Sequence, residues 1–106
     1  MSATALTSSE RAYLRSQANG IQPIFQLGKG GINNNFINQI DEALEARELI
    51  KISLLETCEL SVKEAAELIC ARTGAQSVQM IGRKIVFFRQ ASEKEKRKIK
   101  LAAQKK

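Results

Sequence analysis

Two short apolar runs, SVQMI at residues 77–81 and KIVFF at residues 84–88, are separated only by Gly82 and Arg83. Each run has the composition of a β-strand. A two-residue connection can join only antiparallel neighbours, so this stretch predicts a β-hairpin. The chain must therefore build a sheet, and its other segments have to pack around this hairpin.

Two segments begin with the capping-box spacing, in which a Thr or Ser and a Glu three residues later satisfy each other's backbone N–H groups. Thr7 and Glu10 predict the start of one helix, and Ser61 and Glu64 predict the start of another. The first helix should run to about residue 19, where the pair Asn19-Gly20 predicts a left-handed stop.

A further helix is predicted after the glycine-rich segment LGKGGIN at residues 27–33. Asn33 is a good N-cap, and Ile32 and Ile37 have the spacing of a hydrophobic staple. One face of this helix is apolar and consists of Phe36, Ile40 and Leu44. The acidic residues fall largely outside that face and predict a solvated acidic surface made of Asp41, Glu42, Glu45 and Glu48.

Two more strands are predicted, one at residues 23–27 that opens with Pro23 and one at residues 49–55. In the second strand Ile50, Ile52 and Leu54 alternate with Leu49, Lys51 and Ser53. A strand–helix–strand unit implies a right-handed parallel crossover, and the hairpin adds an antiparallel pair. The predicted fold class is therefore α/β of the two-layer α+β kind, with a mixed four-stranded sheet and the element order α-β-α-β-α-β-β.

The positive charge of the chain is concentrated at its C-terminus. Residues 93–106 contain seven Lys or Arg and two Glu, so they carry +5 of the total formal charge of +6. A run of this kind is often only solvated, yet its charge also suits phosphate binding. We expect a domain at residues 6–90 followed by a basic, flexible tail at 91–106, in which Lys96, Arg97 and Lys98 are candidate contacts for RNA.

The composition disfavours catalysis and metal binding. The chain has no histidine, so the usual acid–base group at neutral pH is absent, and two cysteines cannot by themselves complete a zinc site. Asp41 and Glu45 are four residues apart on a polar helix face, which is typical of solvated charges rather than catalytic groups. We therefore expect no enzyme, no cofactor, no metal and no small-molecule substrate.

Nothing in the sequence predicts a membrane or secretory route. No apolar run approaches the roughly 18 residues of a membrane span. The first residues, MSATALTSSER, lack a basic region followed by an apolar one, so they do not form a secretory signal. We expect a cytoplasmic, monomeric protein.

Residues 28–31 (Gly28, Lys29, Gly30 and Gly31), here called the glycine loop, lie between a predicted strand and a predicted helix. The phosphate loop of NTPases needs Ser or Thr after its lysine, and the dinucleotide pattern needs a glycine where this chain has Asn33, so neither motif is met. Two interpretations stay open from these residues. The glycines could merely turn the chain, or their N–H groups could bind an anion at the helix start, with Lys29 adding charge.

Other basic residues could extend such an anion site. Arg83 and Lys84 lie in the predicted hairpin turn, and Lys51 and Arg89 lie on or beside strands. Each alone is typical of a solvated surface, but together with Lys29 and the tail they could form a phosphate-binding surface. Exposed aromatic residues for stacking on bases are scarce, which disfavours a sheet that reads bases by stacking.

The combined motifs resemble the CRM domain family (chloroplast RNA splicing and ribosome maturation), in its single-domain bacterial form, often called YhbY-like. The resemblance runs from Leu6 to about Arg89 and is carried by LTSSERAYLRSQA, LGKGGIN, EALEARELIKISL, AAELICARTGA and QMIGRKIVFFR. It implies a fold similar to the C-terminal domain of a bacterial translation initiation factor. It also implies a GxxG motif at Gly28 to Gly31, binding to ribosomal RNA, and association with precursors of the large ribosomal subunit.

A second hypothesis belongs to a different class of protein. The acidic helix could dock a protein partner on the ribosome, so that the chain acts as an adaptor and touches RNA only incidentally. Charge reversals at Glu42 and Glu45 would separate the two hypotheses.

Overall fold

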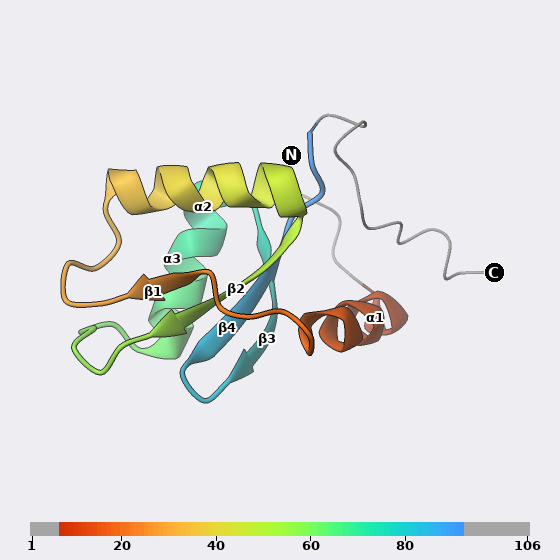
Figure 1. The fold of residues 1–106 in the computed structure, drawn as a ribbon, viewed down its shortest axis with the longest axis horizontal. Helices are drawn as coiled ribbons and strands as arrows, with labels where there is room; N and C mark the ends of the chain where they lie inside the picture. The colour runs from red at the N-terminus through yellow and green to blue at the C-terminus, as the bar shows by residue number, and fades with distance from the viewer. Residues whose placement is uncertain (1–6, 93–106) are drawn as a thin grey trace.

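The computed structural model describes residues 7–92 (Figure 1). It contains three helices and four strands in the predicted order, which confirms the α+β fold class. The elements are α1 (Ser8–Ala18), β1 (Phe25–Leu27), α2 (Asn34–Arg47), β2 (Leu49–Leu54), α3 (Val62–Thr73), β3 (Gln76–Ile81) and β4 (Lys84–Phe88).

The four strands form one mixed sheet in the order β1-β2-β4-β3. β1 runs parallel to β2, whereas β4 runs antiparallel to both β2 and β3. The predicted hairpin is thus confirmed, and α2 makes the crossover between the two parallel strands. Within the described residues, β2 and β4 are the inner strands, and β1 and β3 lie at the edges.

The alternation predicted for β2 divides its side chains between two apolar clusters. Ile50, Ile52 and Leu54 belong to the larger cluster, which includes residues of α2 and α3. Leu49 belongs to a smaller cluster on the other side of the sheet, with Leu14 and Ala18 of α1 and Val86 of β4. Helices α2 and α3 therefore cover one face of the sheet, and α1 covers part of the opposite face, as Figure 1 shows.

Both predicted capping boxes are present in the structure. Thr7 and Glu10 exchange backbone-to-side-chain hydrogen bonds at the start of α1, and Ser61 and Glu64 do the same at the start of α3. The side chain of Asn33 accepts from the N–H of Phe36 at 2.8 Å, so the N-cap predicted for α2 is confirmed as well. These helix starts are local properties of the sequence.

The left-handed stop predicted at the end of α1 is wrong. Asn19 has the right-handed helical conformation, with φ −57° and ψ −31°, and Gly20 does not have a positive φ. The N–H of Ile21 donates to the carbonyl of Ala18 at 3.0 Å, so the chain leaves the helix through a tight right-handed turn. This turn satisfies one of the final carbonyls and does not require a glycine.

Between residues 7 and 92, no helix combines the length and the apolar character that crossing a membrane requires.

We predict that α1 depends on Leu14 for its attachment to the sheet. Leu14 is 0% exposed, so Leu14→Ala should lower the free energy of unfolding by about 2–5 kcal/mol, because it leaves a cavity under the helix. Leu68→Ala is the matched control, since Leu68 is 44% exposed and its loss should change stability by about 0.5 kcal/mol or less. Urea denaturation followed by circular dichroism measures both, and equal midpoints would contradict the assignment.

Candidate nucleic-acid interface

The glycine loop forms a tight turn directly after β1. The N–H of Gly31 donates to the carbonyl of Gly28 at 3.0 Å, which places Lys29 and Gly30 at the exposed tip of the turn. Gly31 has a φ of +69°, a conformation that glycine adopts far more readily than other residues. The turn therefore presents the Lys29 ammonium and bare backbone to solvent.

The glycines in this loop differ in what the fold requires of them. A Cβ at Gly28 would lie 3.2 Å from Cδ1 of Leu55 and 3.5 Å from Oγ1 of Thr57, so Gly28 permits close packing against the segment after β2. A Cβ at Gly30 would meet nothing within 4 Å, and Gly30 does not have a positive φ. Neither packing nor conformation explains a glycine at position 30. A bare backbone there does leave room for a ligand to approach closely.

The N-terminus of α2 follows the loop and faces the same region. Unlike α1 and α3, which have Glu10 and Glu64 in their first turns, α2 has no acidic residue there. The positive end of its helix dipole is therefore not offset by a carboxylate of its own first turn. Arg72 of α3 adds a cation, because its Nη2 donates to Oδ1 of Asn34 at 2.9 Å.

Arg72 was not among the residues predicted from the sequence. It lies in the last turn of α3, 38 positions from Asn34, and no local pattern connects the two residues. Arg72 reaches the N-terminus of α2 because α3 packs beside α2.

The tip of the β3–β4 hairpin is brought to the same end of the sheet as the glycine loop. Arg83 donates from Nε to the carbonyl of Leu54 at 3.0 Å and from Nη2 to the carbonyl of Leu55 at 2.7 Å. Leu55 in turn donates its N–H to the carbonyl of Leu27 at 2.9 Å. We call this region, which holds the glycine loop, residues 55–59 and the hairpin tip at 82–84, the loop end (Figure 1).

The loop end holds several of the predicted cations, and it is not uniformly positive. Lys29, Arg83 and Lys84 are all exposed there. Two exposed carboxylates, Glu56 and Glu59, lie in the segment after Leu55 and lower the local positive potential. The guanidinium of Arg83 also connects the hairpin to the end of β2 through its hydrogen bonds, so Arg83 has a structural role in addition to any contact with a ligand.

Lys51 is not at the loop end. It lies in the middle of β2 in register with Val86, on the sheet face that α1 covers in part, and it is half-buried. The predicted tail residues Lys96, Arg97 and Lys98 lie outside the described residues.

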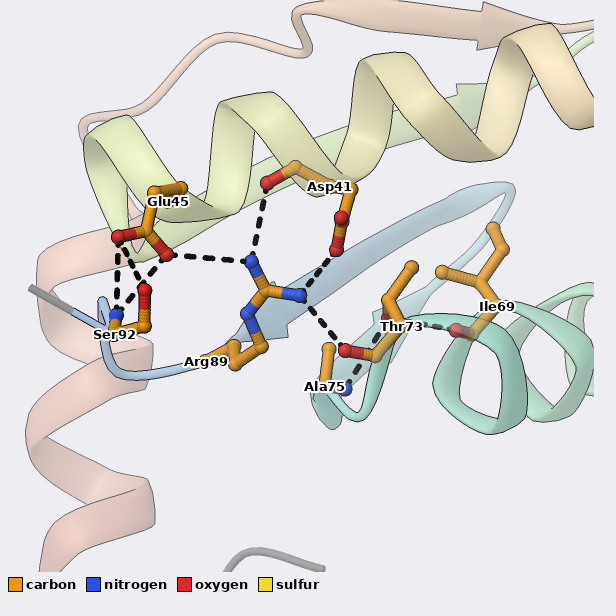
Figure 2. A network of polar contacts seen from close by, with 7 residues as sticks. All are labelled: Asp41, Glu45, Ile69, Thr73, Ala75, Arg89 and Ser92. Carbon is orange, nitrogen blue, oxygen red and sulfur yellow. Dashed lines mark hydrogen bonds and ion pairs between the residues drawn. The ribbon is translucent and has the colours of Figure 1, made fainter.

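Arg89 lies at the opposite end of β4 and is engaged within the fold (Figure 2). It forms an ion pair with Asp41, and its Nη2 lies 3.7 Å from Oε1 of Glu45. It also donates to the carbonyls of Thr73 at 2.8 Å and Asp41 at 3.1 Å. The structure therefore places Arg89 as a link between α2, α3 and β4, apart from the cations of the loop end.

The prediction that the acidic residues of α2 form a solvated surface is wrong for two of them. Glu48 is 0% exposed, and its Oε2 accepts from the N–H of Ala91 at 2.7 Å. Glu45 is half-buried and accepts from both the N–H and the hydroxyl of Ser92 (Figure 2). The chain returns across α2 after β4, and its backbone N–H groups need acceptors there.

Glu48 adopts an unusual backbone conformation at this junction. It follows the last residue of α2 and has a φ of +67°. Its N–H donates to the carbonyl of Leu44 at 2.8 Å, and its carbonyl accepts from the N–H of Arg89 at 2.9 Å. These bonds on both sides hold a conformation that glycine would adopt at lower cost.

Among the described residues, Cys70 has a clear shift in its pKa, and it lies away from the loop end. Burial raises the pKa of the Cys70 thiol, and hydrogen bonding with Ser77 acts in the opposite direction. Cys70 belongs to α3 and packs against the larger apolar cluster, so this thiol is held neutral as part of the packing.

The fold and the loop end together define a small α+β domain in which a glycine loop joins an edge strand to a helix start. The CRS1 / YhbY (CRM) domain model matches residues 6–89, and the chain belongs to this family. The resemblance inferred from the sequence motifs is thereby confirmed.

Individual relatives agree with this membership. The chain is 49% identical over 88 residues to "Probable RNA-binding protein YqeI" of Bacillus subtilis, covering 83% of this chain and 92% of the relative. It is 28% identical over 90 residues to an "RNA-binding protein" of Haemophilus influenzae, covering 85% of this chain and 91% of that one. The chain is also similar to a solved structure, "Solution structure of the hypothetical protein SAV1595 from Staphylococcus aureus, a putative RNA binding protein". The two share 46% sequence identity with a TM-score of 0.72, and the match covers 91% of this chain and 100% of the S. aureus chain.

We predict that two adjacent glycines will respond differently to the same substitution. Gly31→Ala should lower the free energy of unfolding by about 1–2 kcal/mol, because alanine is strained at a φ of +69°. Gly30→Ala should leave stability unchanged or raise it by up to about 1 kcal/mol, because its Cβ enters open space and the unfolded chain loses freedom. Urea denaturation of the two variants tests this, and equal destabilisation would contradict the loop geometry.

Proposed function

We propose that this chain is a non-catalytic RNA-binding protein that associates with precursors of the large ribosomal subunit and assists their assembly in the cytoplasm. In this proposal the monomer holds the backbone of structured ribosomal RNA with its glycine loop. The observation that carries the proposal is Gly30, a glycine at the exposed tip of the loop that neither packing nor backbone conformation requires.

The chemistry of the loop end suits a phosphate group. The backbone beside Gly30 can approach an anion closely, the positive end of the α2 dipole favours negative charge, and Lys29 supplies a point charge. The formal charge of +6 would add a long-range attraction to any polynucleotide. The names of the B. subtilis and H. influenzae relatives agree with RNA as the ligand class.

The ribosomal part of the proposal rests on the kind of relative that the chain matches. The two bacterial relatives are matched over 92% and 91% of their own lengths, as expected for the single-domain form of the family. The resemblance to that form implies association with precursors of the large ribosomal subunit. The adaptor hypothesis is less well supported, because Asp41, Glu45 and Glu48 already bind other parts of this chain.

We predict that Lys29→Glu combined with Gly30→Asp will weaken RNA binding by about tenfold or more, because carboxylates replace a phosphate contact. Both positions are exposed and a side chain at residue 30 enters open space, so the double variant should fold normally. Filter binding to ribosomal RNA fragments and co-sedimentation with large-subunit precursors measure the effect.

The matched control for this double variant is Arg15→Glu combined with Gln17→Asp. It makes the same change in net charge on α1, away from the glycine loop. Equal loss in both variants would show a general charge effect. Unchanged RNA binding and co-sedimentation in the folded Lys29 and Gly30 double variant would remove the loop from its assigned role.

We further predict that removing residues 93–106 will flatten the dependence of RNA affinity on salt. These residues carry seven Lys or Arg. Each phosphate that they neutralise should contribute about −0.7 to the slope of log affinity against log salt for a single strand. Truncation after Ser92 keeps the contacts of Ser92 with Glu45, so the domain should be unchanged. An identical slope in the truncated protein would show that the tail does not bind phosphate.

A further inference from the structure

Two shallow hollows lie side by side along the boundary between β1 and α2. The first, here called the loop hollow, measures about 290 Å³, and its lining includes Gly28, Gly30 and Gly31 of the glycine loop together with Gln26, Asn35 and Gln39. The second, here called the helix hollow, measures about 410 Å³ and is lined by Ile24, Phe25, Gln39, Glu42, Ala43 and Arg47. Gln39 belongs to both linings, so the two hollows adjoin at this residue, and together they are here called the groove.

Residues with amide side chains are among those that line the loop hollow. Gln26 lines it from β1, and Asn35 and Gln39 line it from successive turns of α2. An amide carries both a donor and an acceptor, so it can pair with the edge of a nucleobase as well as with a neutral backbone. Asn and Gln side chains make bidentate hydrogen bonds of this kind with adenine in protein–nucleic acid complexes.

The helix hollow offers an apolar surface with one cation. Ile24, Phe25 and Ala43 are half-buried, and the ring of Phe25 is held by an edge-to-face contact with Phe36 at 6.2 Å between centroids. A flat base could pack on such a surface. Among the described residues, Arg47 makes no side-chain hydrogen bond or ion pair, so its guanidinium is available for a phosphate.

We infer that a single-stranded segment of RNA runs from the glycine loop along this groove, with Gln39 contacting the edge of an unpaired base. The inference rests on the proposed function and adds the form of RNA that this site takes. The groove begins at the proposed phosphate site, continues through base-pairing amides and an apolar surface, and ends at a cation. A duplex keeps its base edges within its grooves, so only unpaired bases can enter.

One residue on the rim opposes RNA and distinguishes this ligand from a protein. Glu42 is exposed and lies one turn beyond Gln39 on α2. It would repel a phosphate and attract a basic peptide. Glu42→Gln should therefore strengthen binding of single-stranded RNA about twofold or leave it unchanged, whereas weaker RNA binding would overturn the proposed path.

The decisive experiment compares two neighbouring amides of the full chain, Gln39→Ala and its matched control Asn38→Ala. Asn38 is exposed on the same helix and lines neither hollow. Fluorescence anisotropy with labelled octaadenylate, octauridylate, octacytidylate and a blunt RNA duplex measures affinity. Gln39→Ala should weaken binding of the preferred single strand by about fivefold or more and reduce the differences between homopolymers. Asn38→Ala should bind like the unaltered protein, and neither variant should change duplex binding.

Outcomes of this experiment separate the inference from the proposed function. If RNA binding depends on Lys29 and Gly30 but Gln39→Ala behaves like Asn38→Ala on every homopolymer, the groove is overturned and the proposed function stands. If Gln39→Ala weakens duplex and single strands equally, the selective contact with an unpaired base is also overturned. If the unaltered protein binds none of these RNAs and no ribosomal RNA, the proposed function and the inference fall together.

Discussion

The structure depends on the position of β2 at the centre of the fold. This strand pairs with β1 on one side and β4 on the other, and side chains from both of its faces are buried. Hydrogen bonds at the C-terminal end of β2 also position the loop end. The N–H of Leu55 donates to the carbonyl of Leu27, and the guanidinium of Arg83 donates to the carbonyls of Leu54 and Leu55. A change in the register of β2 would therefore move the glycine loop and the hairpin tip together.

The glycine loop shows how structural and functional constraints can occupy adjacent residues. Gly28 allows the chain to pack against Leu55, and Gly31 supplies a positive φ that leads into α2. The positive φ favours glycine at position 31 even without a ligand, and Gly28 leaves room for the exposed Leu55 side chain. Gly30 has no such requirement from packing or backbone conformation, so both interpretations that the sequence left open, the simple turn and the anion site, remain at this position.

Much of the fold could be predicted because its signals are local. Capping boxes, the Asn33 N-cap and the two-residue connection of the hairpin each act over a few residues, and each is confirmed. The contacts of Arg72, Arg89 and Glu48 could not be predicted, because their partners lie 38, 48 and 43 positions away. For the same reason the acidic surface was misjudged, since only the returning chain shows that Glu45 and Glu48 are acceptors.

The two ends of α2 differ in their charged groups and in how these are compensated. At its C-terminal half, Asp41, Glu45 and Glu48 bind residues 89–92 of the same chain, so part of their charge is compensated within the fold. At its N-terminus the first turn contains no carboxylate to offset the dipole, and Arg72 lies nearby. The helix has 14 residues and spans about 21 Å between these two ends. Ser92 lies against the C-terminal half of α2 and the glycine loop precedes its N-terminus, so the two hollows lie along the helix between these points.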